Sequence, residues 1–479
     1  MRWKPALATL LGILVSAIAT QGQECAGTGP GGSWQCGKAP GPVEVTRVVA
    51  IRAGRLFNPN LEHLLTNQVI VIRGDRIVDV GPADSVTIPP EAKIIDLSRS
   101  TVLPGLIDAH VHLTDTTRGP LHQQLVALNS ATRSLNAGFT TLMSMGGYGY
   151  TDVELRNAIE SGLVEGPRIL ASGPFLVITR PGDAPYPLDG KPLLTPATSM
   201  FLVADGPEAL RAAVRQQVQY GVDHIKIFTT LSWESLTSGK FGFTPNGEMF
   251  NQPLMTLDEI KAVVDEAHRR GIWISSHTYG GDGLKWAIEA GVDNIQHGMG
   301  ADDADIRMLV QKHLPITSTI LDQRQVEPWD LKQWAPYSRW RLQEQTWKKM
   351  LAAGVKLGFG SGAEPAPDRI YNQACYCSHG VQAEMFPIYV SWGATPLYAL
   401  RMATTVNAEI IHMQNTLGTI EKGKYADIIA VSGDPLQDIT EMQRVKFVMK
   451  GGQVVRNDLS SSNYPTFLSE LPHTEEKAP

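Results

Sequence analysis

The strongest constraint on the fold is a repeated alternation of short apolar segments with amphipathic helical segments between residues 105 and 414. One unit has a capping box at 256–259, apolar residues at helical spacing, a terminating Gly271 and then the apolar run 272–275. A second unit follows directly at 284–297. Because repeated strand–helix units form parallel sheets, the pattern predicts an α/β fold. The number of units favours a closed (β/α)8 TIM barrel over the alternative, an open doubly wound sheet.

β-rich segments flank this region on both sides. Residues 43–104 contain short apolar runs separated by turn residues, which is typical of an antiparallel sheet. The same pattern returns in residues 415–457. We therefore expect the two segments to form one discontinuous β-sandwich domain beside the barrel of residues 105–414. Residues 458–479 are polar and are expected to be a C-terminal tail.

The N-terminus has the features of a secretory signal peptide. Residues 1–19 combine the basic Arg2 and Lys4 with an apolar run and a small-residue cleavage site at 17–19. The alternative, a membrane anchor, needs about 20 apolar residues, and neither this run nor any other segment reaches that length. We therefore expect a periplasmic or secreted protein that does not span the membrane. Residues 20–42 are rich in glycine and proline and are expected to be a linker.

The chain has four cysteines, and an oxidising compartment would permit disulfides between them. Three pairings are possible. Cys25 and Cys36 would close a short glycine-rich loop, which makes this pair the simplest candidate. Cys375 and Cys377 are too few for a zinc site by themselves, and the sequence does not decide whether they are free thiols.

Four histidines stand at the ends of predicted strands. His110 and His112 end the apolar run 106–112, and residues two apart on a strand point to the same face. His277 and His297 end two consecutive predicted strands. A His-x-His pair alone is weak evidence, but active sites of such barrels lie at the carboxyl ends of the strands. Because imidazole is a common metal ligand, this placement predicts a metal site.

Lys226 lies inside another predicted strand, at 223–228. A buried lysine is costly unless it is paired. Burial lowers its pKa, which makes the neutral amine available for covalent chemistry. The alternative is that only the aliphatic stem is buried and the ammonium group reaches solvent.

Together these residues resemble the amidohydrolase superfamily, in particular the branch with imidazolonepropionase-like enzymes, Xaa-Pro dipeptidases and ochratoxinase-type amidases. The resemblance rests on the segment 104–112, on Lys226, on the two later histidines, and on the closing segments 418–427 and 433–435. It covers nearly the whole mature chain. It implies a (β/α)8 barrel with a flanking β-sandwich, and a centre of one or two divalent metal ions, usually zinc.

The resemblance also implies roles for the site residues. His110 and His112 would hold the more buried ion, and His277 and His297 would hold the second. Lys226, carbamylated by carbon dioxide, would bridge the two ions. The implied activity is hydrolysis of a small amide bond, in a dipeptide or an N-acyl amino acid, by metal-activated water.

Charge is consistent with a small-molecule substrate. The chain has 42 basic and 48 acidic residues and a net charge of −6. A mildly acidic chain is a poor candidate for binding nucleic acid or anionic membranes. The sequence leaves open whether the protein is a homo-oligomer.

The predicted eighth strand departs from the family pattern, which has a proton-transferring Asp after Gly-Thr. Here residues 360–362 read Gly-Ser-Gly, and Gly362 has no side chain to transfer a proton. Glu364 is a candidate substitute acid, because on an extended backbone it would share the face of Gly362. Asp368 is another candidate. The remaining alternatives are an altered site with slower or different chemistry, and a non-catalytic ligand-binding protein on the same scaffold.

Two further residues are candidate substrate contacts. Tyr279 stands two residues after His277, where it would reach the mouth of the pocket. His379 lies in the loop after the predicted eighth strand and has a counterpart in the family. The alternative for His379 is an exposed loop histidine without a role.

Overall fold

The computed structural model describes residues 47–114, 119–179, 200–231, 241–365 and 378–459, together with the backbone of 23–26 and 35–38. The chain divides into two units, Met1–Arg47 and Val48–Pro479. No helix within the described ranges is long and apolar enough to cross a membrane.

In the first unit, β1 (Gln23–Ala26) and β2 (Gln35–Lys38) pair antiparallel, and Cys25 lies directly opposite Cys36. Directly opposed Cα atoms in such a pair are about 4.5–5.5 Å apart, within the range that a disulfide spans. The disulfide between these two residues stays a prediction. Cys375 and Cys377 lie outside the described residues.

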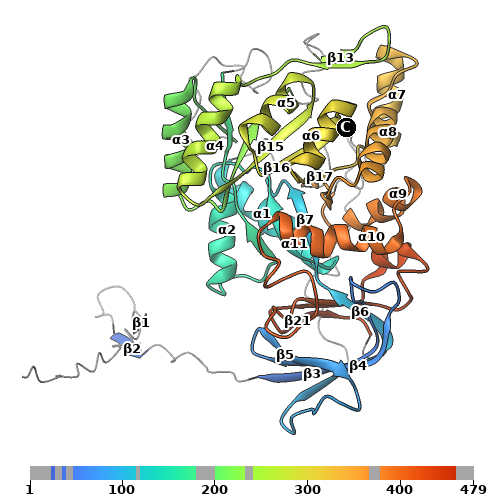
Figure 1. Cartoon of the computed structure of the whole chain (residues 1–479). Helices are drawn as coiled ribbons and strands as arrows, with labels where there is room; N and C mark the ends of the chain where they lie inside the picture. The colour runs from blue at the N-terminus through green and yellow to red at the C-terminus, as the bar shows by residue number, and fades with distance from the viewer. Residues whose placement is uncertain are drawn as a thin grey trace, which may run out of the picture. The chain divides into compact units, whose positions relative to one another are not determined.

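Parallel strands with helices around them make up most of the second unit (Figure 1). In chain order the strands are β7 (Leu106–Val111), β8 (Phe139–Ser144), β9 (Arg168–Leu170), β10 (Phe175–Val177), β12 (His224–Phe228), β15 (Trp273–Gly280), β16 (Asn294–Gly300), β17 (Ile316–Ser318) and β18 (Leu357–Phe359), with β11 (Phe201–Val203) beside β10. The helices are α1 (Pro120–Asn136), α2 (Thr151–Glu160), α3 (Pro207–Gln219), α4 (Leu257–Arg269), α5 (Gly281–Ala290), α6 (Asp303–Gln311), α7 (Gln323–Trp334), α8 (Arg339–Ala353), α9 (Met385–Ser391), α10 (Pro396–Arg401) and α11 (Asn407–Ile410).

The strands form two parallel sheets, with the orders β7-β8-β9 and β11-β10-β12-β15-β16-β17-β18. Hydrogen bonds join these two sheets on both sides. The amide of Gly362, just after β18, donates to the carbonyl of His110 in β7 at 2.8 Å, and the amide of His112 donates to the carbonyl of Ala363 at 2.7 Å. On the other side, the carbonyl of Ala171 after β9 accepts from the amide of Asp223 before β12 at 2.7 Å. The strands therefore form the predicted (β/α)8 barrel.

The outer helices bury one apolar face each against these strands. In α4, Thr256 and Glu259 form the predicted capping box, and Ile260, Val263 and Ala267 are fully buried. Such reciprocal capping satisfies amide groups that the first helical turn leaves without partners.

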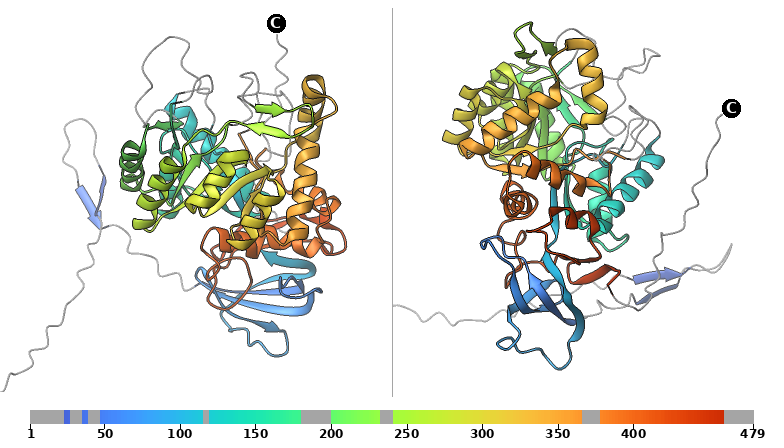
Figure 2. Two further views of the ribbon diagram at one scale, coloured as in Figure 1. Left: turned by 45° about the horizontal axis from the view of Figure 1, so that its top comes forward. Right: turned by 90° about the vertical axis from the view of Figure 1, so that its right-hand side faces the viewer.

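The flanking domain contains strands from both ends of the second unit (Figure 2). Its sheet has the order β21 (Gln453–Asn457), β20 (Phe447–Lys450), β19 (Ile428–Val431), β6 (Lys93–Pro104), β3 (Val48–Leu56), β4 (Leu65–Arg73) and β5 (Arg76–Pro82). The two segments meet where β19 pairs with β6, with Ile429 opposite Leu103. This pairing confirms the discontinuous β domain. Because β6 leads directly into β7, the domain is attached to the first strand of the barrel.

A β-hairpin extends from the loop after β12. Its strands β13 (Phe241–Phe243) and β14 (Met249–Asn251) pair antiparallel. A Cβ atom at Gly300, at the end of β16, would overlap the Met249 side chain. Because Gly300 has no side chain, Met249 of the hairpin can pack directly on the end of β16.

Candidate metal centre

The four predicted histidines lie together at the carboxyl ends of β7, β15 and β16. The ring centroids of His110 and His112 are 5.2 Å apart, those of His110 and His297 4.8 Å, and those of His277 and His297 4.6 Å. Residues from strands far apart in the sequence thus meet at one end of the barrel, as the register of parallel strands requires.

The rings of His110 and His112 face each other with their Nε2 atoms. Nε2 of His110 and Nε2 of His112 are 3.3 Å apart. Two nitrogens that bind one tetrahedral zinc ion at about 2.0–2.1 Å are separated by about 3.3 Å. Nε2 of His297 is buried and has no hydrogen-bond partner among the residues that the structure describes. These donor atoms fit a divalent metal ion.

The imidazoles do not make a complete ligand set by themselves. In the described ranges, no group of three or more His, Cys, Asp or Glu side chains is arranged so that it could hold a metal ion. A metal at this site would therefore need a further ligand from another residue type or from water, as catalytic zinc sites commonly have.

Burial controls the protonation of these histidines. It lowers the pKa values of His110 and His297 well below the ordinary value, and it lowers the pKa of His112 to about 3. Lys226 is the second cause for His110 and His112, because a nearby positive charge disfavours another. The rings are therefore neutral at pH 7, which is the form that binds metal.

Lys226 lies in the interior, in the middle of β12. Its side chain is 1% exposed, so the alternative in which the ammonium group reaches solvent is wrong. Nζ is 5.6 Å from the ring centroid of Phe228, and that ring stacks on His277 at 4.4 Å. Burial alone lowers the pKa of Lys226 well below the ordinary value. Burial therefore favours the neutral amine, which is the form of Lys226 that can act as a nucleophile.

Residues outside the cluster form hydrogen bonds with the rings of His110 and His297 and with the backbone of His112. Nδ1 of His110 is 2.6 Å from Oε1 of Gln296, and Nδ1 of His297 is 2.7 Å from Oγ1 of Thr319. Nε2 of His379 donates to the carbonyl of His112 at 2.9 Å. In metal sites such partners fix the tautomer and the orientation of a histidine ligand.

Gln296 was not singled out in the sequence because it precedes His297 directly. Strict strand alternation puts neighbouring residues on opposite faces. His297 has a φ of +72°, which breaks the alternation, and both residues contact His110. No sequence pattern signals this conformation at a non-glycine residue.

Asp108 lies one strand repeat before His110, inside the barrel. It is fully buried, and its carboxylate accepts from the hydroxyl of Ser361 at 2.5 Å and from the amide of Ser361 at 3.0 Å. Burial raises the pKa of Asp108 to about 7, against the effect of these hydrogen bonds. The contact joins β7 to the segment after β18. The sequence signal was its two-residue spacing from His110.

The backbone at Gly362 differs from the extended conformation that the sequence argument assumed. Its φ is +62°, so the expectation that Glu364 shares its face is wrong. Glu364 is half-buried and forms a bridge with Ser378. A Cβ atom on Gly362 would come no closer to a non-neighbouring residue than 3.7 Å, from Cγ2 of Thr319. A Cβ atom at this position would therefore make only ordinary van der Waals contacts. Asp368 lies outside the described residues.

The two candidate substrate contacts differ in their surroundings. The ring of Tyr279 is 4.6 Å from that of His277 and 5.3 Å from that of His297, so it lies beside the cluster. His379 is fully buried, contrary to an exposed loop position, and its Nδ1 is 2.7 Å from Oγ of Ser134. Both nitrogens of His379 thus have protein partners, one of which is the backbone carbonyl of His112. A contact between His379 and a substrate stays a prediction.

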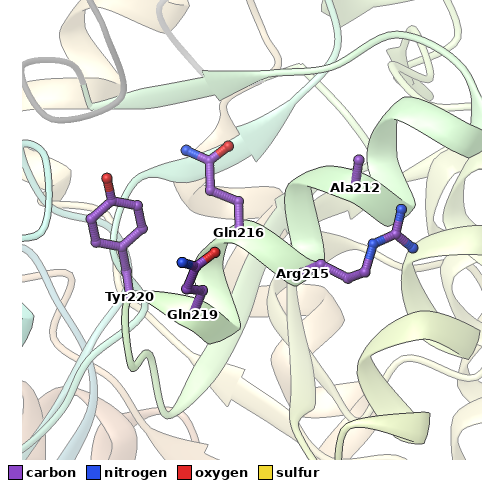
Figure 3. A pocket seen from close by; sticks show the side chains of 5 residues that line it. All are labelled: Ala212, Arg215, Gln216, Gln219 and Tyr220. Carbon is purple, nitrogen blue, oxygen red and sulfur yellow. The ribbon is translucent and has the colours of Figure 1, made fainter.

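A separate surface pocket lies on α3 (Figure 3). It is lined by Ala212, Arg215, Gln216, Gln219 and Tyr220. None of these residues belongs to a barrel strand or to the histidine cluster. The pocket therefore takes no part in the candidate metal centre.

Known proteins resemble this chain over most of its length. Residues 101–455 match the model of the Amidohydrolase family. Ochratoxinase of Aspergillus niger is 27% identical over 455 residues, which cover 86% of this chain and 87% of the relative. A solved Xaa-Pro dipeptidase with methionine bound in its active site has a TM-score of 0.70 and 29% identity, over 86% of this chain and 100% of that chain. A prolidase complexed with N-methylphosphonate-L-proline has a TM-score of 0.71 and 29% identity, with the same coverage.

Proposed function

Because this chain belongs to the amidohydrolase family, we propose that it is a metal-dependent hydrolase of a small amide bond, in a dipeptide or an N-acyl amino acid. The observation that carries the proposal is the pair of Nε2 atoms of His110 and His112, 3.3 Å apart, with two more histidines beside them. The resemblance to a prolidase with a proline analogue bound supports a dipeptide with C-terminal proline as one substrate.

Each residue of the cluster has a role in this proposal. His110 and His112 would hold one ion, preferably zinc, and His277 and His297 a second. The neutral amine of Lys226 would add to carbon dioxide, lose a proton and become a carbamate, whose oxygens complete the ligand set. A bound divalent ion would supply an activated water and a Lewis acid for the amide carbonyl. Tyr279 would contact the substrate beside the two later histidines.

Hydrolysis also requires a proton for the leaving nitrogen. Gly362, which stands where the family has a proton-transferring Asp, has no side chain that could supply it. A general acid there contributes about 100- to 10,000-fold in rate. Glu364 remains the candidate in the described part of the chain, although it is not placed by strand alternation. The absence of a side chain at Gly362 favours the second candidate function, a ligand-binding protein with a degenerate catalytic site.

Metal content and turnover of the His110→Ala variant test the proposal. We expect the purified wild-type protein to contain divalent metal and to hydrolyse members of a panel of Xaa-Pro dipeptides and N-acyl amino acids. His110→Ala should lose the metal and more than 100-fold of the activity. His268→Ala is the control, because His268 is half-exposed on α4 and pairs with Asp293 at 2.8 Å. Metal-free wild-type protein, or unchanged turnover in His110→Ala, would contradict the proposal. Bound metal without turnover would favour the ligand-binding function.

We also propose that the protein is exported to the periplasm or secreted, on the basis of the signal-peptide pattern of residues 1–19. Mass spectrometry of protein from expressing cells should find a mature N-terminus near Thr20. It should also find the peptide with Cys25 and Cys36 lighter by two hydrogen atoms before reduction. An intact Met1 in the exported fraction would contradict processing.

A further inference from the structure

Gln296 has an unusual position for an amide side chain. It is fully buried in β16, yet its Oε1 reaches Nδ1 of His110 in β7 at 2.6 Å. These strands are not neighbours, because β16 pairs with β15 and β17 in one sheet, whereas β7 pairs with β8 in another. The Gln296 side chain therefore links β16 to β7 through the interior of the barrel, at one ring of the histidine cluster.

The chemistry of the contact determines the tautomer of His110. An amide oxygen can only accept a hydrogen bond, so Nδ1 of His110 must carry the proton. The lone pair is then on Nε2, the atom that faces Nε2 of His112 at 3.3 Å. The other end of the Gln296 amide, Nε2, is buried without a hydrogen-bond partner among the described residues. A buried amide donor without an acceptor is destabilising, and an acceptor that binds there removes this cost.

We propose that Gln296 is a positioning residue of the metal centre, which fixes His110 with its carbonyl oxygen and reserves its amide N–H for an anionic oxygen at the site. That oxygen belongs either to a carbamate on Lys226 or to the substrate. The inference rests on the proposed function, which supplies the metal ion at His110 and both candidate oxygens.

Asn294 provides a matched control. It lies two residues earlier in β16, is equally buried, and its Nδ2 donates to Oγ1 of Thr317 at 2.8 Å. Its side-chain hydrogen bonds within the described residues go to Thr317, which is not a member of the histidine cluster. Leucine at either position removes a buried amide, but only the change at Gln296 removes a partner of His110.

Zinc affinity of the full-length variants, measured by competition with a chromogenic chelator, is the first test. We expect Gln296→Leu to bind zinc about 10- to 100-fold more weakly than the wild type, the loss that such partners commonly cause. Gln296→Glu keeps an acceptor for His110 and should retain zinc affinity within about threefold, far less than that loss. Asn294→Leu should bind zinc as the wild type does. Wild-type affinity in Gln296→Leu, or an equal loss in Asn294→Leu, would overturn the positioning role.

The N–H donor is tested by the kinetics of the same variants. Gln296→Glu removes the donor and should lower kcat by at least tenfold while zinc affinity is retained. Titration of the metal-loaded variants with bicarbonate separates the two acceptors. Weaker activation by bicarbonate than in the wild type identifies the carbamate oxygen, and a raised KM at saturating bicarbonate identifies the substrate oxygen. Wild-type kcat and KM in Gln296→Glu would overturn the reserved donor.

The tautomer of His110 separates this inference from the proposed function. Nitrogen NMR of the metal-free, full-length protein with 15N-labelled histidine should show His110 protonated at Nδ1 in the wild type and in Gln296→Glu. Gln296→Leu should lose that preference. Protonation at Nε2 in the wild type would overturn the inference whether or not metal binds. Protonation at Nδ1 in a protein that binds no metal would refute the metal-dependent hydrolase alone.

Discussion

Left-handed backbone at His297 shapes the site at the scale of single residues. A non-glycine residue in this region costs about 1–2 kcal/mol and persists only where its surroundings impose it. Nδ1 of His297 bonds Thr319, and its ring packs between those of His110 and His277. The left-handed conformation directs the ring of His297 toward the other histidines, and these contacts hold the residue in that conformation.

Gly362→Asp restores a carboxylate where the family has its proton donor. The nearest non-neighbouring atom to the new Cβ would be 3.7 Å away, so the side chain fits, but the φ of +62° should cost about 1 kcal/mol of stability. We expect kcat for the best amide substrate to rise by about tenfold or more, because a general acid is supplied. Gly362→Asn is the control, since asparagine tolerates the same φ without a titratable proton. Equal kcat values for the two variants would show that the acid is provided elsewhere.

His379 makes stability dependent on pH. Burial lowers its pKa from 6.5 to about 4. Between these values the unfolded chain binds a proton that the folded chain excludes, so stability falls as the pH falls from 6.5 to 4. We expect His379→Gln to reduce the slope of unfolding free energy against pH in this window by about 1.4 kcal/mol per pH unit. Urea denaturation at several pH values measures the slope, and an identical slope in the variant would contradict this assignment.

At the scale of elements, α5 packs on the end of β12 through a glycine. A Cβ atom at Gly283 would overlap the carbonyl oxygen of Thr229 and lie 2.6 Å from Cγ2 of Thr230. Alanine in a helix is normally about 1 kcal/mol more favourable than glycine. We expect the opposite sign here, with Gly283→Ala destabilising by about 2 kcal/mol because the helix must move away.

Gly291→Ala, at the end of the same helix, provides the comparison. Gly291 has a φ of +87° and open space around it, so only the backbone term of about 1 kcal/mol applies. Chemical denaturation of both variants measures the difference. A Gly283→Ala protein that is as stable as the wild type would contradict close packing at this position.

Elements with strong local signals were predictable from the sequence, and elements set by tertiary contacts were not. The capping box and periodic apolar face of α4 are local properties, and the structure has them as predicted. The third strand position was harder, because it is divided into β9 and β10 around Gly173, whose φ is +66°. The β13–β14 hairpin depends on contact with Gly300 far along the chain. No short window of sequence contains that contact.

The site followed the same division. The histidines were predictable because strand ends in a parallel barrel share one face of the molecule. Gln296 and the orientation of Glu364 were not, because left-handed backbone at His297 and Gly362 breaks the two-residue alternation on which the argument rests. The partners of His379 come from α1 and β7, which only the folded chain brings together.

At the scale of the whole molecule, one aromatic ring links the β domain to the barrel. Cζ of Arg76 lies 3.6 Å from the ring centroid of Tyr425, and Cζ of Arg168 in β9 lies 3.9 Å from the same centroid. Such cation–π contacts contribute about 0.5–2 kcal/mol each. We expect Tyr425→Leu to lower the free energy of unfolding by about 1–2 kcal/mol, whereas Tyr425→Phe keeps the ring and most of the stability. Guanidinium denaturation measures both, and equal losses would assign the effect to the hydroxyl group.

The bonds from Gly362 to His110 and from His112 to Ala363 fasten the first strand of the barrel to the segment that follows the last. During synthesis, all four histidines are therefore added to the chain before Gly362 and Ala363, which hold His110 and His112 in place. A nascent chain that stops short of residue 363 contains the four histidines but lacks the hydrogen bonds that hold His110 and His112. The arrangement of the four imidazoles should therefore form late in translation and abruptly, only after residue 363 has been added.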